Sequence, residues 1–424
     1  MYRTINALVL VLKRIVPEPV VALLRRPYHF SINFLSALGA GFPARKLVMI
    51  GVTGTKGKST VTDLIYTTLL DNGYAVAAAS TIRFAIKDKS DPNLFKMTMP
   101  GRGFIQDFLA RAVKAGCTHA IVELTSESTL NYRHLFLSLD ALVFTNLQKE
   151  HIESHGSFEK YAAAKLRIGK ALAKSKKRPR AIIANADDPA SEPYLALPVE
   201  KKAPFSYTDA KDVELLPGRV TFSYQGVPFR MQLPGSFNIM NALAAANAAT
   251  FAGLPLEKSA ASLAKLERVP GRTERIDAGQ SFQVVVDYAH TPDSLAALYA
   301  AYPGRKICVL GNTGGGRDTW KRPEMGRIAD EACDKVVLTN EDPYDEDPRA
   351  IVEAMAKGMK RAPEIIMDRR SAIATALRVA RTGDTVLVSG KGTDPYIMEA
   401  KGAKTPWSDA RVVREELEQL LTEL

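Results

Sequence analysis

The chain has 424 residues, of which 46% are hydrophobic and 24% are charged, an ordinary balance for a globular protein. This length exceeds what one hydrophobic core usually serves, so two or three domains are expected. The net charge of +11 suits an acidic partner, but the sequence has no RNA-binding signature, zinc-finger spacing or basic stripe interleaved with aromatics. We therefore expect no nucleic-acid partner.

The three cysteines, Cys117, Cys308 and Cys333, are widely spaced and match no metal-binding motif. This pattern argues against a disulfide framework. It predicts a reducing compartment, and hence a cytoplasmic protein.

Residues 1–46 are predicted to form a short N-terminal helical segment. The apolar stretch 5–12 is cut short by Lys13 and Arg14, so it is far too short to span a membrane. No small-residue cleavage site follows, so no signal peptide is expected. Basic residues beside apolar ones leave two alternatives. The segment is a membrane-surface helix or, favoured, a helix that packs on the next domain.

A glycine-rich turn follows the apolar run that begins at Leu47. The turn reads Gly-Val-Thr-Gly-Thr-Lys-Gly-Lys-Ser over 51–59, and a helix-periodic segment begins at Thr60. A strand, a glycine loop and a helix in this order are typical of a phosphate cradle, although the loop is one residue longer than the strict G-x-x-x-x-G-K pattern. Lys58 would reach the terminal phosphates, and the Ser59 hydroxyl would bind Mg²⁺. A chance lysine in a Gly/Thr-rich turn is the disfavoured alternative.

Strands and helices then alternate, which predicts an α/β fold with a mainly parallel sheet and helices on both faces. We expect a central P-loop domain over 47–273 and a C-terminal Rossmann-like α/β domain over 274–424. Expected strands are 119–123, 141–145, 181–184, 283–286, 306–310, 335–339, 365–367 and 385–388, with an antiparallel hairpin over 219–233. Expected helices are 104–115, 238–252 and 294–301.

Ligands of open α/β sheets gather at the carboxyl ends of the strands. Glu123, Asn146 and Asp287 each follow a predicted strand. A carboxylate beside a phosphate loop is well placed to hold Mg²⁺, although Glu123 could instead cap a helix or form a surface ion pair. His151, five residues after Asn146, is as consistent with a structural role as with a functional one.

Several stretches in order along the chain resemble the Mur ligase family, whose ATP-dependent members form the amide bonds of the peptidoglycan stem peptide. The matching stretches are GVTGTKGKST (51–60), VELTSES (122–128), FTNLQKEHIESHGSFEKYAAAK (144–165), NADDP (185–189), LPGSFNIMNALAA (233–245), VPGRTERI (269–276), VVDYAHTPDSL (285–295), GGGRDTWKRPEMG (314–326) and SGKGTDPY (389–396).

The resemblance implies roles for single residues. Those implied to act in catalysis are Lys58, His151, Lys165 and Arg272. ATP would be bound by Gly54, Thr55, Lys56, Gly57, Lys58, Ser59, Thr60, Asn146, Asn238, Asn241, Arg272 and Asp287. Two Mg²⁺ ions would be bound by Ser59, Glu123, His151 and a carbamylated Lys165. Substrate contacts would come from Thr98, Thr125, Ser126, Arg317, Asp342, Tyr344, Gly392 and Asp394.

The implied reaction phosphorylates the terminal carboxylate of a UDP-linked muramoyl peptide, or a similar anionic acceptor, with ATP. The amine of a free amino acid then displaces phosphate from the acyl phosphate. Two alternatives stay open: a ligase like folylpolyglutamate synthase, and a nucleotide-binding partner subunit without ligase activity.

The chain departs from the family pattern in five places. Two are the Gly-Lys-Gly-His-Glu segment, which becomes Gly-Lys-Gly-Thr-Asp over 390–394, and the glycine loop before Arg317, which is one residue longer. Only residues 1–46 precede the first strand, where relatives carry a longer domain that holds UDP. The Thr-Thr-Pro segment becomes Thr98-Met99-Pro100, and the Asp-Asn-Pro-Arg motif becomes 341–344, Glu-Asp-Pro-Tyr. An arginine that pairs a carboxylate bidentately is therefore replaced by Tyr344, so meso-diaminopimelate is not expected to be the preferred amino acid.

Overall fold

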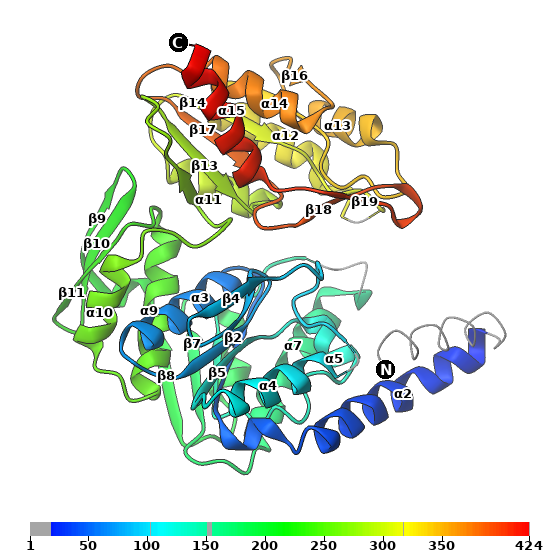
Figure 1. Cartoon of the computed structure of the whole chain (residues 1–424), viewed down its shortest axis with the longest axis vertical. Helices are drawn as coiled ribbons and strands as arrows, with labels where there is room; N and C mark the ends of the chain where they lie inside the picture. The colour runs from blue at the N-terminus through cyan, green and yellow to red at the C-terminus, as the bar shows by residue number, and fades with distance from the viewer. Residues whose placement is uncertain (1–17, 102, 151–154, 317, 424) are drawn as a thin grey trace. The chain divides into compact units, whose positions relative to one another are not determined.

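A computed structural model of the protein describes residues 18–101, 103–150, 155–316 and 318–423 (Figure 1). The chain divides into two compact units. Unit 1 comprises the chain up to Leu147 together with 159–205 and 247–254, and unit 2 comprises 148–158, 206–246 and 255–424. None of the helices within the described ranges is both long and apolar enough to cross a membrane.

Unit 1 is built on an eight-stranded sheet in the order β4-β3-β2-β5-β1-β6-β7-β8. Along the sheet, β2, β5, β1, β6, β7 and β8 pair with their neighbours in parallel. The pairs β2–β3 and β3–β4, at one edge, are antiparallel. The mainly parallel sheet is thus confirmed. The strands are β1 (Val48–Thr53), β2 (Val76–Ala79), β3 (Arg83–Ile86), β4 (Lys89–Pro92), β5 (His119–Glu123), β6 (Ala141–Phe144), β7 (Ala181–Asn185) and β8 (Lys201–Phe205).

Helices cover this sheet because alternate strand residues point to opposite sides. Met49 and Leu142 face a core to which α4 and α7 contribute Phe108 and Ile168, while α3 contacts β1, β2 and β5. The helices and 3-10 turns of this unit are α2 (Glu18–Gly39), η1 (Pro43–Lys46), α3 (Lys58–Asp71), α4 (Phe104–Lys114), α5 (Ser126–Leu130), α7 (Phe158–Ala173), η2 (Pro189–Ser191) and α8 (Glu192–Leu195).

Unit 2 holds a six-stranded sheet in the order β12-β13-β17-β14-β15-β16, which is parallel except for β12. Its strands are β12 (Glu274–Ile276), β13 (Gln283–Asp287), β14 (Lys306–Leu310), β15 (Lys335–Leu338), β16 (Glu364–Ile365) and β17 (Thr385–Ser389). A separate antiparallel sheet contains β9 (Ala210–Leu216), β10 (Arg219–Tyr224) and β11 (Val227–Met231). The 3-10 turn η3 (Tyr207–Asp209) directly precedes β9.

The parallel sheet of unit 2 has a core on each face. Along β13, Val284 and Val286 pack with α14 and α15, whereas Val285 packs with α11, α12 and α13. Helices on both faces are therefore confirmed for this sheet. The remaining elements are α9 (Ser236–Phe251), through which the unit boundary passes, α10 (Leu256–Lys265), α11 (Pro292–Ala300), α12 (Lys321–Ala332), α13 (Pro348–Ala356), α14 (Arg369–Arg378), β18 (Tyr396–Met398), η4 (Ala400–Gly402), β19 (Lys404–Pro406) and α15 (Asp409–Glu423).

The predicted segments agree with these elements to within a few residues. The expected hairpin over 219–233 is β10–β11, and its turn lies at Gln225-Gly226. The sequence did not predict β2, β3, β4, β8, β9, β12 or the short pair β18–β19. Apart from β8 and β9, these strands have only three or four residues each, too few to show a reliable alternation.

The turn between β1 and α3 passes unusually close to the chain that follows β6. Gly54 has a positive φ of 149°, and a Cβ built there would overlap the Thr145 hydroxyl and lie 3.1 Å from the backbone nitrogen of Asn146. Gly73 also has a positive φ, of 80°, but a Cβ there would meet nothing within 4 Å. Of these two glycines, only Gly54 is therefore constrained by both backbone and space.

This contrast predicts different costs for two alanine substitutions. Gly73→Ala should lower the free energy of unfolding by about 1 kcal/mol, the cost of left-handed backbone strain alone. Gly54→Ala should lower it by at least about 2 kcal/mol more, because the added methyl group must displace the Thr145 region. Urea denaturation of both variants measures the difference, and equal losses would contradict the close approach.

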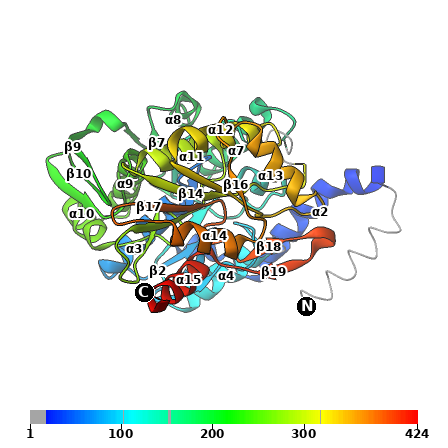
Figure 2. The same ribbon diagram turned by 90° about the horizontal axis from the view of Figure 1, so that it is seen from above.

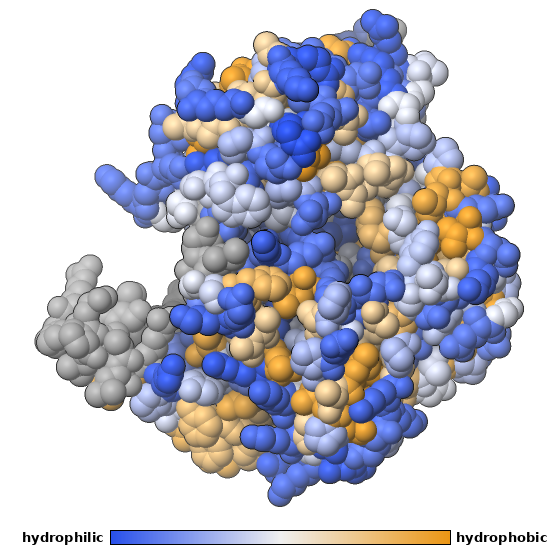
Figure 3. Space-filling model, turned by 180° about the vertical axis from the view of Figure 1, so that it is seen from behind, coloured by the Kyte–Doolittle hydropathy of each residue, from blue (hydrophilic) through white to orange (hydrophobic). Residues whose placement is uncertain are grey.

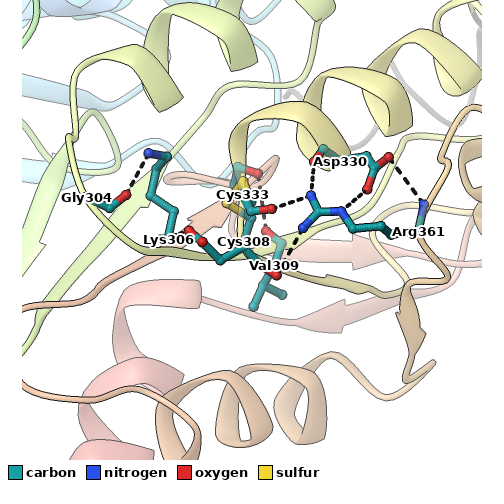
Figure 4. The surroundings of a disulfide bond; sticks show 9 residues. Gly304, Lys306, Cys308, Val309, Asp330, Cys333 and Arg361 are labelled. Carbon is teal, nitrogen blue, oxygen red and sulfur yellow. Dashed lines mark hydrogen bonds and ion pairs between the residues drawn. A yellow bond between two sulfur atoms is a disulfide. The ribbon is translucent and has the colours of Figure 1, made fainter.

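The structure corrects the expectation that the cysteines form no disulfide. Cys308 on β14 and Cys333 just after α12 are bonded, with their Cα atoms 6.1 Å apart, while Cys117 is buried and unpaired (Figure 4). Wide spacing along the sequence was a poor guide, because the crossover from β14 through α12 brings the two residues together. The Arg361 guanidinium donates to the Cys333 carbonyl at 2.7 Å and to the Asp330 carboxylate at 2.8 Å, which ties the next loop to this corner.

The two bonded cysteines are 25 residues apart in the sequence. A crosslink of this span lowers the conformational entropy of the unfolded chain and so stabilises the folded protein by about 3 kcal/mol. Reductant should therefore lower the melting temperature of the wild-type protein and of Cys117→Ser, but not that of Cys308→Ala/Cys333→Ala. Denatured protein should titrate with one free thiol before reduction and three after it. Three free thiols before reduction would show that the bond does not form.

Candidate active site

The glycine loop of unit 1 is anchored by the segment that follows β6. The Thr55 N–H donates to the Asn146 carbonyl at 2.8 Å, and the Lys56 N–H donates to Asn146 Oδ1 at 2.8 Å. The Thr145 hydroxyl donates to the Lys56 carbonyl at 2.6 Å. Asn146, predicted to bind the nucleotide, thus holds the loop itself.

The end of this loop has the chemistry of an anion site. Lys58 Nζ donates to the Thr55 carbonyl at 2.8 Å, so the ammonium group curls over the loop. Gly57, with φ of 79°, is the N-cap of α3 and has no side chain with which to cap that helix. A helix N-terminus beside a lysine favours phosphate groups, because both present positive charge.

Two predicted metal ligands meet at the start of α3. Ser59 Oγ donates to Glu123 Oε2 at 2.9 Å, and both residues are at most 5% exposed. They meet because β1 and β5 pair in parallel, with Val52 opposite Glu123. A hydroxyl and a carboxylate are hard oxygen donors, so this pair fits Mg²⁺. Within the described ranges no cluster of three His, Cys, Asp or Glu residues could hold a metal, and His151 lies outside those ranges.

Thr81 and Thr98 extend this polar cluster. The Thr81 N–H donates to Glu123 Oε2 at 2.9 Å, and the Thr81 hydroxyl lies 2.7 Å from the hydroxyl of Thr98. Thr98, predicted to contact substrate, is therefore linked to the Glu123 carboxylate through one residue.

Lys165 lies under the same loop. It projects from α7, is 2% exposed, and donates from Nζ to the Gly54 carbonyl. Its ammonium nitrogen also lies 4.9 Å from the centre of the Tyr161 ring, whose hydroxyl is 3.0 Å from Thr55 Oγ1. A single turn of α7 thus supports the loop at two points.

Thr125 and Ser126 begin α5. Thr125 caps the helix by accepting the Ser128 N–H at 3.3 Å, and Ser126 is 3% exposed. Beyond α5, the Arg133 guanidinium donates to the Met99 carbonyl and so holds the segment that carries Thr98.

In unit 2, Asp287 accepts two backbone hydrogen bonds at the end of β13, from Thr273 N–H at 2.6 Å and from Ala289 N–H at 2.7 Å. The Arg272 guanidinium lies 4.3 Å from the centre of the Tyr288 ring. Arg272 and Asp287 are thus brought to one corner of this unit.

Asn238 and Asn241 lie one turn apart on α9, as their spacing predicts. Asn238 Nδ2 donates to the Pro234 carbonyl at 2.8 Å, and Asn241 Nδ2 donates to Asn238 Oδ1 at 3.0 Å. Both side chains are buried in the structure.

A buried charge cluster follows β15 and β17. Lys391 is fully buried and donates to Asp342 Oδ1 at 2.8 Å, and its Nζ is 3.7 Å from Asp394. Burial raises the pKa of the neighbouring Glu341 carboxyl, whose Oε1 accepts from Thr313 Oγ1 at 2.8 Å and whose Oε2 is buried without a hydrogen-bond partner. The charge of Asp394, together with burial, raises the pKa of the Tyr288 hydroxyl.

The other predicted substrate residues frame this cluster. Gly392 has φ of 49°, and a Cβ there would lie 2.8 Å from the Gly271 carbonyl oxygen. Tyr344 also has a positive φ, of 53°, and its backbone N–H donates to the Met398 carbonyl at 3.1 Å. Arg317 lies outside the described residues.

Sequence reasoning missed Thr81, Tyr161, Arg133 and Lys391. Tyr161 stands four residues before Lys165 and so shares its helix face, a signal that could have been used. Lys391 stands between two glycines directly after a strand. Thr81 acts mainly through its backbone N–H, which no side-chain motif reports.

Comparisons with known proteins agree with this geometry. Residues 52–249 match the Mur ligase middle domain, and residues 271–392 match the Mur ligase glutamate ligase domain. The chain is 37% identical to a UDP-N-acetylmuramyl-tripeptide synthetase of Roseiflexus sp., over 95% of this chain and 84% of that protein. It is 34% identical to a UDP-N-acetylmuramoyl-L-alanyl-D-glutamate–2,6-diaminopimelate ligase of Syntrophomonas wolfei, over 91% of this chain and 81% of that protein.

Solved structures give the same picture. A UDP-N-acetylmuramoyl-L-alanyl-D-glutamate–2,6-diaminopimelate ligase is similar with a TM-score of 0.61 and 29% identity, covering 88% of this chain and 79% of that one. A folylpolyglutamate synthase of Mycobacterium tuberculosis reaches a TM-score of 0.70 at 16% identity, covering 89% and 96%, which is a likeness of fold alone. With two domains matched in order and relatives at 34–37% identity over most of its length, this chain belongs to the Mur ligase family of ATP-dependent ligases.

Proposed function

We propose that this protein joins the amine of a free amino acid to the carboxylate of a UDP-muramoyl-peptide-like acceptor, with hydrolysis of ATP to ADP and phosphate. The observation that carries this proposal is the convergence of Lys58, Ser59, Glu123 and Lys165 on one glycine loop. The names of the relatives support the class of acceptor.

The chemistry needs activation, because a carboxylate resists nucleophiles and has a poor leaving group. Transfer of the γ-phosphoryl group to a carboxylate oxygen releases ADP and forms an acyl phosphate. The amine nitrogen then attacks the carbonyl carbon, the C–O bond to phosphate breaks, and the nitrogen loses a proton. Lys58 and the first turn of α3 would hold the anionic groups in line, which is where most of the rate gain is expected.

Magnesium would be held by the Ser59 hydroxyl and the Glu123 carboxylate, and a second ion by His151 and a carbamylated Lys165. Bound Mg²⁺ neutralises phosphate charge during the transfer. Carbamylation suits Lys165, because it would convert a buried cation under the loop into an anion with two oxygen donors.

We assign ATP contacts in unit 2 to Arg272, Asp287, Asn238 and Asn241. The matched regions 52–249 and 271–392 support the domain boundaries 47–273 and 274–424. A cytoplasmic location follows from the need for ATP. Recognition of the added amino acid is assigned to the 341–344 and 390–394 segments, with Arg317.

Phosphate release from ATP with UDP-muramoyl-L-alanyl-D-glutamate and a panel of amino acids tests this proposal. One phosphate should form for each amide bond found by mass spectrometry. Lys58→Ala should lower kcat at least about a hundredfold, because transition-state charge loses its cation. Lys114→Ala, an exposed lysine on α4, should not change it.

The same panel tests the choice of amino acid. Because Tyr344 replaces the arginine of the family motif, meso-diaminopimelate should have a lower kcat/KM than the preferred amino acid. A clear preference for diaminopimelate would contradict this expectation. Turnover only with a folate and glutamate would favour the folylpolyglutamate reading, and ATP binding without acyl phosphate from any acid would favour a non-catalytic subunit.

Carbamylation of Lys165 has its own spectroscopic test. Protein incubated with ¹³C-labelled bicarbonate should show a carbamate carbonyl signal by NMR, and Lys165→Arg should lack it. Lys170→Arg, on the same helix but exposed, should keep the signal. A spectrum of the wild-type protein without a carbamate signal would argue against the modified lysine.

A further inference from the structure

Helix α2 of unit 1 has two different apolar faces. One face packs on its own unit. The Phe30 ring lies 6.1 Å from that of Tyr132 and 5.7 Å from that of Phe136, and Asn33 Nδ2 donates to the Asn131 carbonyl at 2.9 Å. The expectation that this segment packs on the next domain is thus confirmed for α2, the part of 1–46 that the structure describes together with η1.

The other face of α2 is exposed. Leu24, Tyr28, Leu35 and Leu38 have exposed fractions of 54%, 36%, 61% and 53%. At 3.6 residues per turn, these four side chains fall within a sector of about 80° that lies opposite Asn33 and also contains the exposed Ser31. We call them the outer stripe. Figures 1 and 2 show α2 running out from the rest of its unit, and Figure 3 shows apolar areas between hydrophilic ones on one face of the molecule.

The outer stripe is more than scattered exposed leucines. A soluble helix normally exposes polar residues on the face turned away from its core. Here the face toward the core and the face away from it are both mainly apolar between Leu24 and Leu38. An exposed stripe dominated by large apolar side chains in this way marks an interaction surface.

Charge identifies the partner. Residues 1–46 contain seven basic residues and one acidic residue, Glu18, and so carry +6 of the net charge of +11. Within the described part, Arg26, Arg45 and Lys46 are exposed. A second copy of α2 would bring like charges together, which disfavours a helix pair. An anionic lipid surface complements both the charge and the stripe.

We propose that α2 docks lengthwise on an anionic phospholipid surface through the outer stripe, and that the net positive charge of residues 1–46 attracts it to the headgroups. The helix would lie in the interface rather than cross it, since it is not apolar enough to span and carries Arg25 and Arg26. Its inner face would keep unit 1 attached. This docking does not depend on the ligase reaction.

Vesicle flotation of the full chain tests the proposal. The wild-type protein should float with phosphatidylcholine vesicles that contain a third of phosphatidylglycerol, and much less with phosphatidylcholine alone. High salt should release it, because the headgroup attraction is screened. Leu24→Glu/Leu35→Glu/Leu38→Glu should lower the floated fraction at least about tenfold. Leu215→Glu, a leucine with 55% exposure on β9, should float like the wild type.

Three results would overturn the proposal: no flotation with anionic vesicles, equal flotation with neutral vesicles, or equal flotation of the triple variant. If the wild type instead sediments as a dimer that the triple variant loses, the outer stripe binds a second copy. Circular dichroism and thermal melting establish that the triple variant is folded. Should it not fold, Leu35→Ser alone and the salt dependence of the wild type still decide the question.

Discussion

The close contact between the glycine loop and the chain after β6 is the constraint on which the candidate site depends. Because Gly54 has no side chain, its backbone can lie against Thr145 and Asn146. These residues then bind Thr55 and Lys56 through hydrogen bonds between 2.6 and 2.8 Å. With the loop so held, its carbonyls face the ammonium groups of Lys58 and Lys165. The site is therefore organised by backbone geometry, and the charged side chains are oriented by it.

Buried charges give unit 2 a comparable framework. Arg369 and Asp409 are almost fully buried and paired at 2.7 Å, and Arg369 also donates to the Ser389 carbonyl. Lys391 and Asp342 form a second buried pair nearby. Such pairs add little net stability, because desolvation offsets their attraction, but a partner left alone would be costly. Their effect is to specify one arrangement of the loops that follow the strands, which is what a selective binding site requires.

Glu341 is a third ionisable side chain buried beside these pairs. Its carboxyl is buried, has a raised pKa, and keeps one oxygen without a hydrogen-bond partner beside Gly390. A side chain at Gly390 would collide with that carboxyl group. The loops that follow β15 and β17 therefore pack closely at this unpaired oxygen.

Helix α2 is packed on one side and exposed to water on the other. Asn33 and Ala37 are buried on one side of the helix, while Leu24, Leu35 and Leu38 are exposed to water on the other. Exposure of those leucines to water has a free-energy cost relative to their burial. Together with the concentration of positive charge in 1–46, this cost is what an external anionic surface would relieve.

The sequence by itself determined the α/β class, the central strands of both parallel sheets, the positions of α3, α4, α9 and α11, and the identity of the phosphate loop. These features depend on local periodicity, glycine spacing and short-range backbone preferences, which the order of residues states directly. Tertiary structure alone decided which distant residues meet. Glu123 reaches Ser59 only because β5 pairs beside β1, and Cys308 reaches Cys333 only because α12 returns to the start of β15. The exposed outer stripe likewise became visible only when the inner face of α2 was seen to be packed, because helical periodicity shows that a face is apolar but not what covers it.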